Sequence, residues 1–339
     1  MVSLIIYSHA VGVCVCVCER ERERERETET ERERERERES CAIASLQGHI
    51  LVLGPPKLTN LHSDQIRYVD THTDNYIRYF EGHEASVTSL IMHPGEDHFI
   101  TCSRDDTVRL WDLSTRLWTG RLNLRSAHLV AYDPSGVTFA VGSAASGSVL
   151  MYDARQFDKA PFATFDIVAA CRAVDPQHVM QGWTKLEFSN NGRSLLVGTR
   201  GAGHFVLDAF TGALVAYLAK PQGSGTRRLA PGEVGPTSRS AGPFESSGDC
   251  AFSLDGMHVL SGGARRDMLV WDLSQATQPP PPPLALGATP DQLREYQQRV
   301  TLQPSCVLED QREAAVLAVN PRFNFVATAD EEVLFWVPS

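Results

Sequence analysis

The stretch Tyr79–Asp112, YFEGHEASVTSLIMHPGEDHFITCSRDDTVRLWD, decides the fold of this chain. It contains three short apolar runs, at residues 87–92, 99–102 and 108–111. Turn-forming residues separate them, with Pro-Gly-Glu-Asp after the first run and Arg-Asp-Asp after the second. Short β-prone runs bounded by such turns are typical of antiparallel strands. The stretch therefore predicts consecutive strands of one sheet.

The two ends of this stretch carry a further signature. It opens near Gly82-His83 and closes on Trp111-Asp112. A Gly-His pair and a Trp-Asp pair at this spacing resemble the WD repeat, in which each unit is a four-stranded blade of a β-propeller. The predicted fold class is therefore an all-β, WD-repeat β-propeller.

Four polar or aromatic side chains of the stretch are predicted to form a hydrogen-bonded tetrad. His83 is expected to bond to Ser103 and Asp105, and Ser103 to accept from the indole N–H of Trp111. A buried network of this kind stabilises a fold only when every member is satisfied. A catalytic His–Asp pair is the alternative, but the repeat spacing favours the structural role.

The rhythm of apolar runs and turns continues along the chain. Further blades are predicted to close at Tyr152-Asp153, Leu207-Asp208 and Trp271-Asp272. About six blades are recognisable, the first incomplete and the last with three strands, and seven are expected in the intact protein. Propellers avoid exposed sheet edges by ring closure, so the intact protein is expected to hold another blade and a closing strand.

The chain divides into two predicted parts, residues 1–40 and residues 41–339. The first part holds Val-Cys and Glu-Arg alternation, as translated dinucleotide repeats would give, and we interpret it as an artefact of the gene start. A signal peptide over residues 1–18 is the alternative, but a basic start and a small-residue cleavage site are missing. The second part is the propeller, with loop insertions predicted at 221–243 and 278–304.

The second insertion contains five consecutive prolines within residues 278–283 and a predicted short helix over residues 291–299. The prolines fit either a plain loop expansion or a ligand for SH3- or WW-type domains. The plain expansion is favoured because no basic anchor stands beside them.

Composition limits the functional classes. The formal charge is −10, and residues 19–39 contribute −3 through eleven Glu and eight Arg, which leaves −7 for the remainder. An acidic surface argues against direct nucleic-acid binding. Neither a membrane span nor a CxxC pair is found in the sequence, and Cys41, Cys102, Cys171, Cys250 and Cys306 are expected to be reduced thiols.

An enzyme is not expected. The sequence has no GxSxG, HExxH or P-loop motif. The histidines at 49, 62, 72 and 83 have no partners at metal-ligand spacing, so neither a metal nor a cofactor is predicted.

Several strings go beyond the generic repeat. They resemble the small WD-repeat subunit shared by COMPASS-type histone methyltransferase complexes and by RNA polymerase II termination and phosphatase complexes. The strings are QIRY (65–68), NYIRYF (75–80), TVRLWDL (107–113), FDKAPFATF (157–165), WTKLEFSNNG (183–192), NPRF (320–323) and FWVP (335–338).

The resemblance implies a non-catalytic nuclear adaptor. Its implied partners are a SET-domain methyltransferase, other COMPASS subunits and the phosphorylated C-terminal repeat of RNA polymerase II, with phosphatase or cleavage and polyadenylation subunits as further partners. Neither a nucleic acid nor a membrane is among them.

A second role open to WD-repeat proteins is that of substrate receptor for a cullin ubiquitin ligase. The run Tyr152-Asp153-Ala154-Arg155 resembles the WDxR box of such receptors.

Four arginines are candidate phosphopeptide-binding residues on general physical grounds. All turns between the second and third strands of the blades open on one face of a propeller. Arginine binds phosphate with two parallel hydrogen bonds. The candidates in these turns are Arg104, Arg200, Arg265 and Arg266. Plain solvated turn residues are the alternative, which Asp105 and Asp106 beside Arg104 favour.

Overall fold

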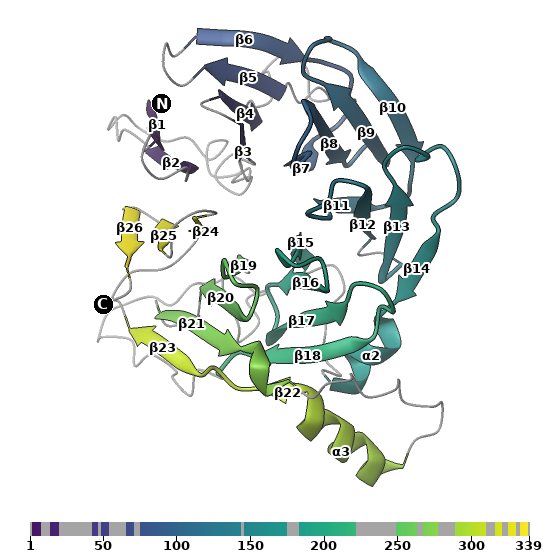
Figure 1. Ribbon diagram of the computed structural model, residues 1–339, viewed down its shortest axis with the longest axis vertical. Helices are drawn as coiled ribbons and strands as arrows, with labels where there is room; N and C mark the ends of the chain where they lie inside the picture. The colour runs from purple at the N-terminus through teal and green to yellow at the C-terminus, as the bar shows by residue number, and fades with distance from the viewer. Residues whose placement is uncertain are drawn as a thin grey trace, which may run out of the picture.

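The computed structural model describes residues 2–7, 14–19, 43–46, 49–53, 66–70, 75–143, 146–174, 183–221, 249–262, 267–276, 289–309, 316–320, 325–329 and 333–337. In these residues six antiparallel sheets follow one another around a common centre (Figure 1). We number them blades 1 to 6 in chain order and name the strands of each blade a to d from the centre outwards. The arrangement is the predicted WD-repeat β-propeller.

Blade 2 is the stretch that decides the fold. Its strands are β7 (Val87–Met92), β8 (His98–Ser103), β9 (Thr107–Asp112) and β10 (Trp118–Asn123), in the sheet order β10-β9-β8-β7. The three predicted runs are confirmed as strands. Phe99 of β8 pairs in register with Trp111 of β9, and their rings stack with centroids 5.8 Å apart. The two central strands are buried on both faces because neighbouring blades cover them.

The next three blades repeat this order. Blade 3 consists of β11 (Ala127–Tyr132), β12 (Thr138–Ser143), β13 (Ser148–Asp153) and β14 (Ala163–Asp166). Blade 4 begins with β15 (Trp183–Phe188), β16 (Ser194–Thr199), β17 (Gly203–Asp208) and β18 (Leu214–Ala219). Blade 5 consists of β19 (Cys250–Phe252), β20 (His258–Gly262), β21 (Asp267–Asp272) and β23 (Cys306–Glu309).

The predicted closing dipeptides each end strand c of their blade. The aspartate accepts a hydrogen bond from the backbone N–H two residues further on: Ser114 to Asp112 at 2.7 Å, Arg155 to Asp153 at 2.8 Å, Phe210 to Asp208 at 3.0 Å and Ser274 to Asp272 at 2.9 Å. Asp side chains favour this local turn. The recurring aspartate therefore stops the strand and starts the turn into strand d.

The first blade differs from the prediction. β3 (Ile43–Leu46), β4 (His49–Leu53), β5 (Ile66–Asp70) and β6 (Asn75–Phe80) form a four-stranded sheet, so the predicted incomplete first blade was wrong. β4 pairs with β5 from His49 opposite Asp70 to Leu53 opposite Ile66. A Trp-Asp pair is missing here, and the register shows that these strands belong together.

The two ends of the described chain lie beside each other. Blade 6 has three strands, β24 (Val316–Val319), β25 (Val326–Ala329) and β26 (Val333–Trp336), as predicted for the last blade. No strand was predicted in residues 1–40, but β1 (Val2–Tyr7) and β2 (Cys14–Glu19) pair there as a hairpin. This hairpin lies between blades 1 and 6 (Figure 1).

The second predicted insertion is largely built into the propeller. Helix α3 (Pro290–Val300) confirms the short helix predicted over residues 291–299. β22 (Thr301–Leu302) then pairs in parallel with β18, as a fifth strand of blade 4, before β23 returns to blade 5. The proline run and most of the predicted loop 221–243 lie outside the described residues.

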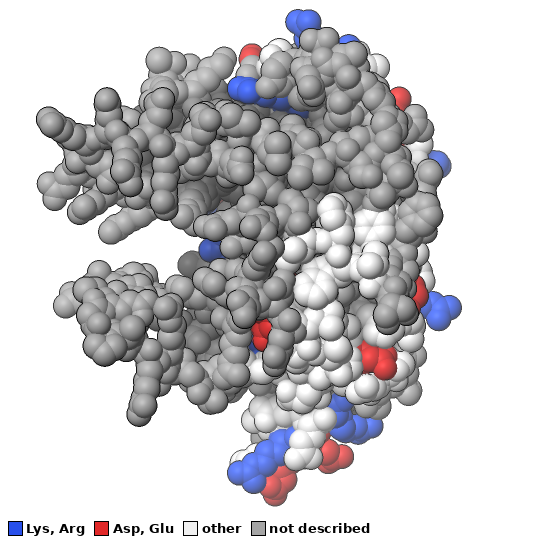
Figure 2. All heavy atoms as spheres, turned by 90° about the vertical axis from the view of Figure 1, so that its left-hand side faces the viewer, with Lys and Arg blue, Asp and Glu red and all other residues white. Residues whose placement is uncertain are grey.

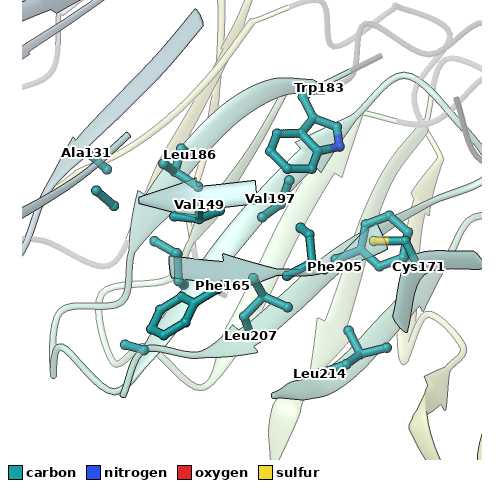
Figure 3. Close-up of a cluster of buried hydrophobic side chains, with 14 of the residues drawn as sticks. Ala131, Val149, Phe165, Cys171, Trp183, Leu186, Val197, Phe205, Leu207 and Leu214 are labelled. Carbon is teal, nitrogen blue, oxygen red and sulfur yellow. The ribbon is translucent and has the colours of Figure 1, made fainter. Parts of the chain in front are cut away.

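The largest apolar cluster lies between blades 3 and 4 (Figure 3). Val149 and Phe165 of blade 3 face Leu186 and Val197 of blade 4. Helix α2 (Val168–Val174), which the sequence analysis did not predict, adds Cys171 to the same cluster. Such inter-blade packing holds neighbouring sheets together because apolar area leaves water.

Candidate functional site

A buried hydrogen-bond network links three of the four predicted tetrad residues in blade 2. His83 Nδ1 lies 2.9 Å from Asp105 Oδ2, and His83 Nε2 lies 2.7 Å from Thr101 Oγ1. The indole Nε1 of Trp111 donates to the same Thr101 hydroxyl at 2.9 Å. The hydroxyl at the centre of the network is therefore that of Thr101.

The prediction that Ser103 takes this place was wrong. The Ser103 hydroxyl instead donates to the carbonyl of Ala85 at 2.8 Å and accepts from the backbone N–H of Asp105 at 3.2 Å. Thr101 and Ser103 lie on the same face of β8, since side chains two apart share a face. Phe99 stands opposite Trp111, so Thr101 is the next same-face side chain and Ser103 lies a further step of about 6.6 Å away.

Asp105 anchors the turn between strands b and c of blade 2. Burial alone would raise the pKa of its carboxyl, but hydrogen bonds from His83, Thr107 and the backbone of Glu84 lower the pKa below its ordinary value. The guanidinium of Arg109 lies 3.8 Å from the same carboxylate. The carboxylate is thus charged and fully engaged.

The network has the character of a structural element. His83 is 3% exposed and Trp111 0% exposed, so a substrate does not reach either ring. The network ties the segment before β7 to strands b and c of the same blade. Catalysis by a His–Asp pair needs contact with the reacting group.

A second buried network, which the sequence analysis missed, links blades 4 and 5. His204 Nδ1 accepts from the backbone N–H of Thr199 at 3.0 Å, so Nε2 carries the proton and donates to Ser261 Oγ at 2.7 Å. Burial lowers the pKa of His204 well below its ordinary value, and the nearby charge of Lys220 adds to this. Ser261 stands ten residues before Trp271, as Thr101 stands ten before Trp111, which is the signal that could have found it.

A small ionic cluster lies on the first strand of blade 4 and just before the first strand of blade 5. Lys185 Nζ lies 3.3 Å from Glu187 Oε2 and 3.6 Å from Asp249 Oδ1. Burial raises the pKa of Glu187. Asp249 also accepts from the backbone N–H of Leu317 at 2.6 Å, which joins blade 5 to blade 6. The sequence shows Lys185 and Glu187 two residues apart in the string 183–188, but this spacing did not predict an ion pair between blades.

The four candidate phosphopeptide arginines are only partly described. Arg104 and Arg200 are exposed in the b–c turns of blades 2 and 4, whereas Arg265 and Arg266 lie outside the described residues. On the side of the molecule drawn in Figure 2, described basic and acidic side chains intermingle, most densely at the end where α3 lies.

Metal ligands and reactive thiols do not gather in the described part of the chain. No group of three His, Cys, Asp or Glu side chains that would hold a metal ion occurs among those residues. Cys102, Cys171 and Cys250 are buried free thiols and Cys306 is an exposed one, while Cys41 lies outside the described residues. Within the same described ranges, no helix has the length and apolar character to cross a membrane.

One segment of the chain matches a known family of sequence repeats. Residues 74–112 match the family described as "WD domain, G-beta repeat". The matched segment contains β6 of blade 1 followed by β7, β8 and β9 of blade 2. A sequence repeat therefore overlaps two blades.

Whole proteins match over most of the chain. It is 30% identical over 289 residues to "WD repeat-containing protein 82" of Drosophila melanogaster, covering 83% of this chain and 74% of that protein. It is 32% identical over 276 residues to "COMPASS component SWD2" of Saccharomyces cerevisiae, covering 80% and 70%. It is 27% identical over 279 residues to "Set1 complex component swd2" of Schizosaccharomyces pombe, covering 80% and 74%. With the propeller fold and this coverage together, the chain belongs to the family of WD-repeat proteins that includes WD repeat-containing protein 82 and the COMPASS component SWD2.

Proposed function

We propose that this protein is a non-catalytic WD-repeat adaptor subunit of a COMPASS-type histone methyltransferase complex in the nucleus. The observation that carries the proposal is the 32% identity to the COMPASS component SWD2 over 70% of that protein. The buried His83 ring, bonded to Asp105 within blade 2, is not placed to act on a substrate, which agrees with a non-catalytic role.

The propeller offers a rigid frame with turns on two faces, which suits a protein that joins other proteins. Its partners in this proposal are the SET-domain methyltransferase, the other COMPASS subunits and the phosphorylated C-terminal repeat of RNA polymerase II, with phosphatase or cleavage and polyadenylation subunits as further partners. The exposed Arg104 and Arg200 support a phosphate-binding b–c face, to which the sequence prediction adds Arg265 and Arg266.

Affinity purification of the tagged full chain, followed by mass spectrometry, tests the proposal. SET-domain and other COMPASS subunits are the expected co-purifying proteins. Cullin adaptors in their place would support a ubiquitin-ligase receptor, for which the exposed Arg155 after Asp153 is the relevant feature.

The polymerase contact has its own test in solution. Fluorescence anisotropy compares a Ser-phosphorylated heptad-repeat peptide with its unphosphorylated form. Arg265→Glu together with Arg266→Glu should weaken binding of the phosphorylated peptide, and added salt should weaken it too, because the attraction is partly screened. Unchanged affinity in the double variant would remove the b–c face from the proposal while leaving COMPASS membership to the purification.

A further inference from the structure

Large apolar side chains are exposed in the turns at one end of the blades. In a four-stranded meander, the a–b and c–d turns lie at one end of the strands and the b–c turns at the other. Five large hydrophobic side chains between 41% and 76% exposed lie in a–b or c–d turns: Leu117, Val137, Phe162, Phe210 and Met257. In the described b–c turns, residues 104–106, 146–147 and 200–202, no exposed large hydrophobic side chain is found.

Hydrogen bonds between blades hold these turns in place. His93 Nδ1 accepts from the backbone N–H groups of Gly95 and Glu96, so its Nε2 donates to the carbonyl of Gly136 in the next blade, at 3.0 Å. Asn190 Nδ2 of blade 4 likewise donates to the carbonyl of Leu254 in blade 5, at 2.7 Å. A surface that is already ordered loses little entropy when a partner binds.

The string FDKAPFATF contributes the most exposed aromatic ring between blades 2 and 3. Phe157 is half-buried and packs closely against Gly120 of β10. A Cβ atom added at residue 120 would lie only 2.3 Å from the Phe157 ring, so this contact requires glycine. The backbone N–H of Phe162 donates to Met151 at 3.0 Å, which fixes the other end of the loop. The Phe162 ring is nevertheless 62% exposed. The fold thus holds the loop firmly and leaves this ring in water.

A hollow of about 200 Å³, lined in part by Val137 and Phe157, lies at the junction of blades 2 and 3. Its walls combine the apolar side chains of Leu110, Val137 and Phe157 with the polar groups of Glu96 and Arg155. We call the turns around it, residues 93–97, 112–117, 133–137 and 153–162, the 2/3 rim.

The 2/3 rim is acidic. Its six carboxylate residues are Glu96, Asp97, Asp112, Asp133, Asp153 and Asp158. Its basic residues are Arg116, Arg155 and Lys159, and the Lys159 ammonium donates to Gln156 at 2.7 Å. The guanidinium of Arg78 adds a fourth cation, since it donates to the rim carbonyls of Leu113 and Thr115. Hydrogen bonds from Ser114 lower the pKa of Asp112, which keeps that carboxylate charged. Cations near an apolar surface are therefore favoured here over anions.

We propose that the 2/3 rim binds an extended segment of a partner protein in which large apolar side chains alternate with Lys or Arg. The apolar side chains cover Leu117, Val137 and Phe162 and fill the hollow, and the basic side chains face the carboxylates. This occupant has the opposite charge to the phosphopeptide proposed for the b–c face. The two surfaces lie at opposite ends of the strands, so they do not compete, and the proposal is independent of the phosphate contact.

The test uses the full chain and three fluorescein-labelled peptides of equal length. The first alternates Leu and Phe with Lys, the second replaces each Lys by Glu, and the third replaces each Leu and Phe by Ser. Fluorescence anisotropy should show the first peptide binding about tenfold or more tightly than either of the others. Higher salt should weaken that binding in part.

Variants locate the binding. Leu117→Ser with Phe162→Ser should weaken binding of the first peptide about tenfold, since anchors of this kind carry most of the affinity. Ile77→Ser with Val307→Ser is the matched control, because those side chains are 44% and 41% exposed on outer strands. Its affinity should stay at the wild-type value, and both variants should keep the wild-type melting temperature. Equal losses in both variants, equal affinity for the Lys and Glu peptides, or no binding of the first peptide would each overturn the proposal.

Discussion

The Thr101 hydroxyl shows how much depends on a single side chain. It is hydrogen-bonded to both His83 Nε2 and the Trp111 indole nitrogen, so two buried ring nitrogens share one oxygen as their partner. Trp271 is the contrasting case in blade 5. Ser261, ten residues before it, is bonded instead to His204 and to backbone carbonyls, and the Trp271 indole N–H has no hydrogen-bond partner. The same spacing therefore supports two different networks.

Thr101→Val should lower the free energy of unfolding by about 1–3 kcal/mol, because it removes the hydroxyl to which His83 Nε2 and the Trp111 indole N–H are both bonded. A double-mutant cycle in urea gives the clearest measurement. The effects of Thr101→Val and Trp111→Phe on the free energy of unfolding should be non-additive, whereas the effects of Ser103→Ala and Trp111→Phe should simply add. Coupling of Ser103 with Trp111, and not of Thr101, would contradict the hydrogen bonds described above.

Trp111→Ala should lower the free energy of unfolding by about 3–5 kcal/mol, because it empties a large, fully buried site. Asp105→Ala should cost less, about 1–3 kcal/mol, through the loss of the hydrogen bond to His83. Urea denaturation measures both. Negligible effects of both substitutions would show that the network of blade 2 does not support the fold.

His204 should make stability depend on pH. Its folded pKa lies well below the ordinary value of 6.5, so the unfolded chain binds the proton more readily. The contribution is present above about pH 6.5 and is lost as the pH falls below it. The urea concentration at the midpoint of wild-type unfolding should therefore decrease as the pH is lowered from about 7 to about 5. His204→Gln should flatten this trend.

At the scale of elements, α3 and β22 join two blades. The chain leaves blade 5 after β21, forms α3, adds β22 to blade 4 and returns as β23. Tyr296 and Val300 of α3 enter the core between blades 3 and 4, and Gln297 donates to the carbonyl of Ala173 in α2 at 2.7 Å. The insertion thus supports the outer edge of blade 4.

Thr289→Ala should weaken this joint. The Thr289 hydroxyl accepts from the backbone N–H of Gln292, whose side chain accepts in return from the backbone N–H of Thr289. Loss of such a cap costs about 1 kcal/mol. Hydrogen exchange should speed up in α3 and β22 and stay unchanged in blade 2. The exposed Gln298→Ala is the control, and equal exchange in both variants would contradict this role of the cap.

At the scale of the whole molecule, the β1–β2 hairpin lies between the first and last blades (Figure 1). Among the described residues β1 and β2 pair only with each other, so removing them takes no strand pairing from a blade. A chain that starts at Ser40 should therefore unfold at the same urea concentration as the full chain. A chain that starts at residue 54 also loses β3 and β4, and its midpoint should fall clearly. A clear loss of stability on the first truncation would show that the hairpin supports the ring.

The sequence by itself determined the first three strands of blade 2 and the ends of strand c in blades 2 to 5, because their signals are local. An aspartate that caps its own turn ends strand c wherever the rest of the chain lies. The short helix predicted over residues 291–299 also has a local signal, because α3 carries its own capping box.

Only the tertiary structure decided which distant groups meet. Thr101 and Ser103 have the same chemistry and face the same side of β8, so strand register alone selects Thr101 for Trp111. Register likewise completes blade 1 and places β22 in blade 4. The 2/3 rim depends on turns from two blades, which no local signal relates. Register and inter-blade packing arise from contacts across the sheets, and a pattern of period two does not specify them.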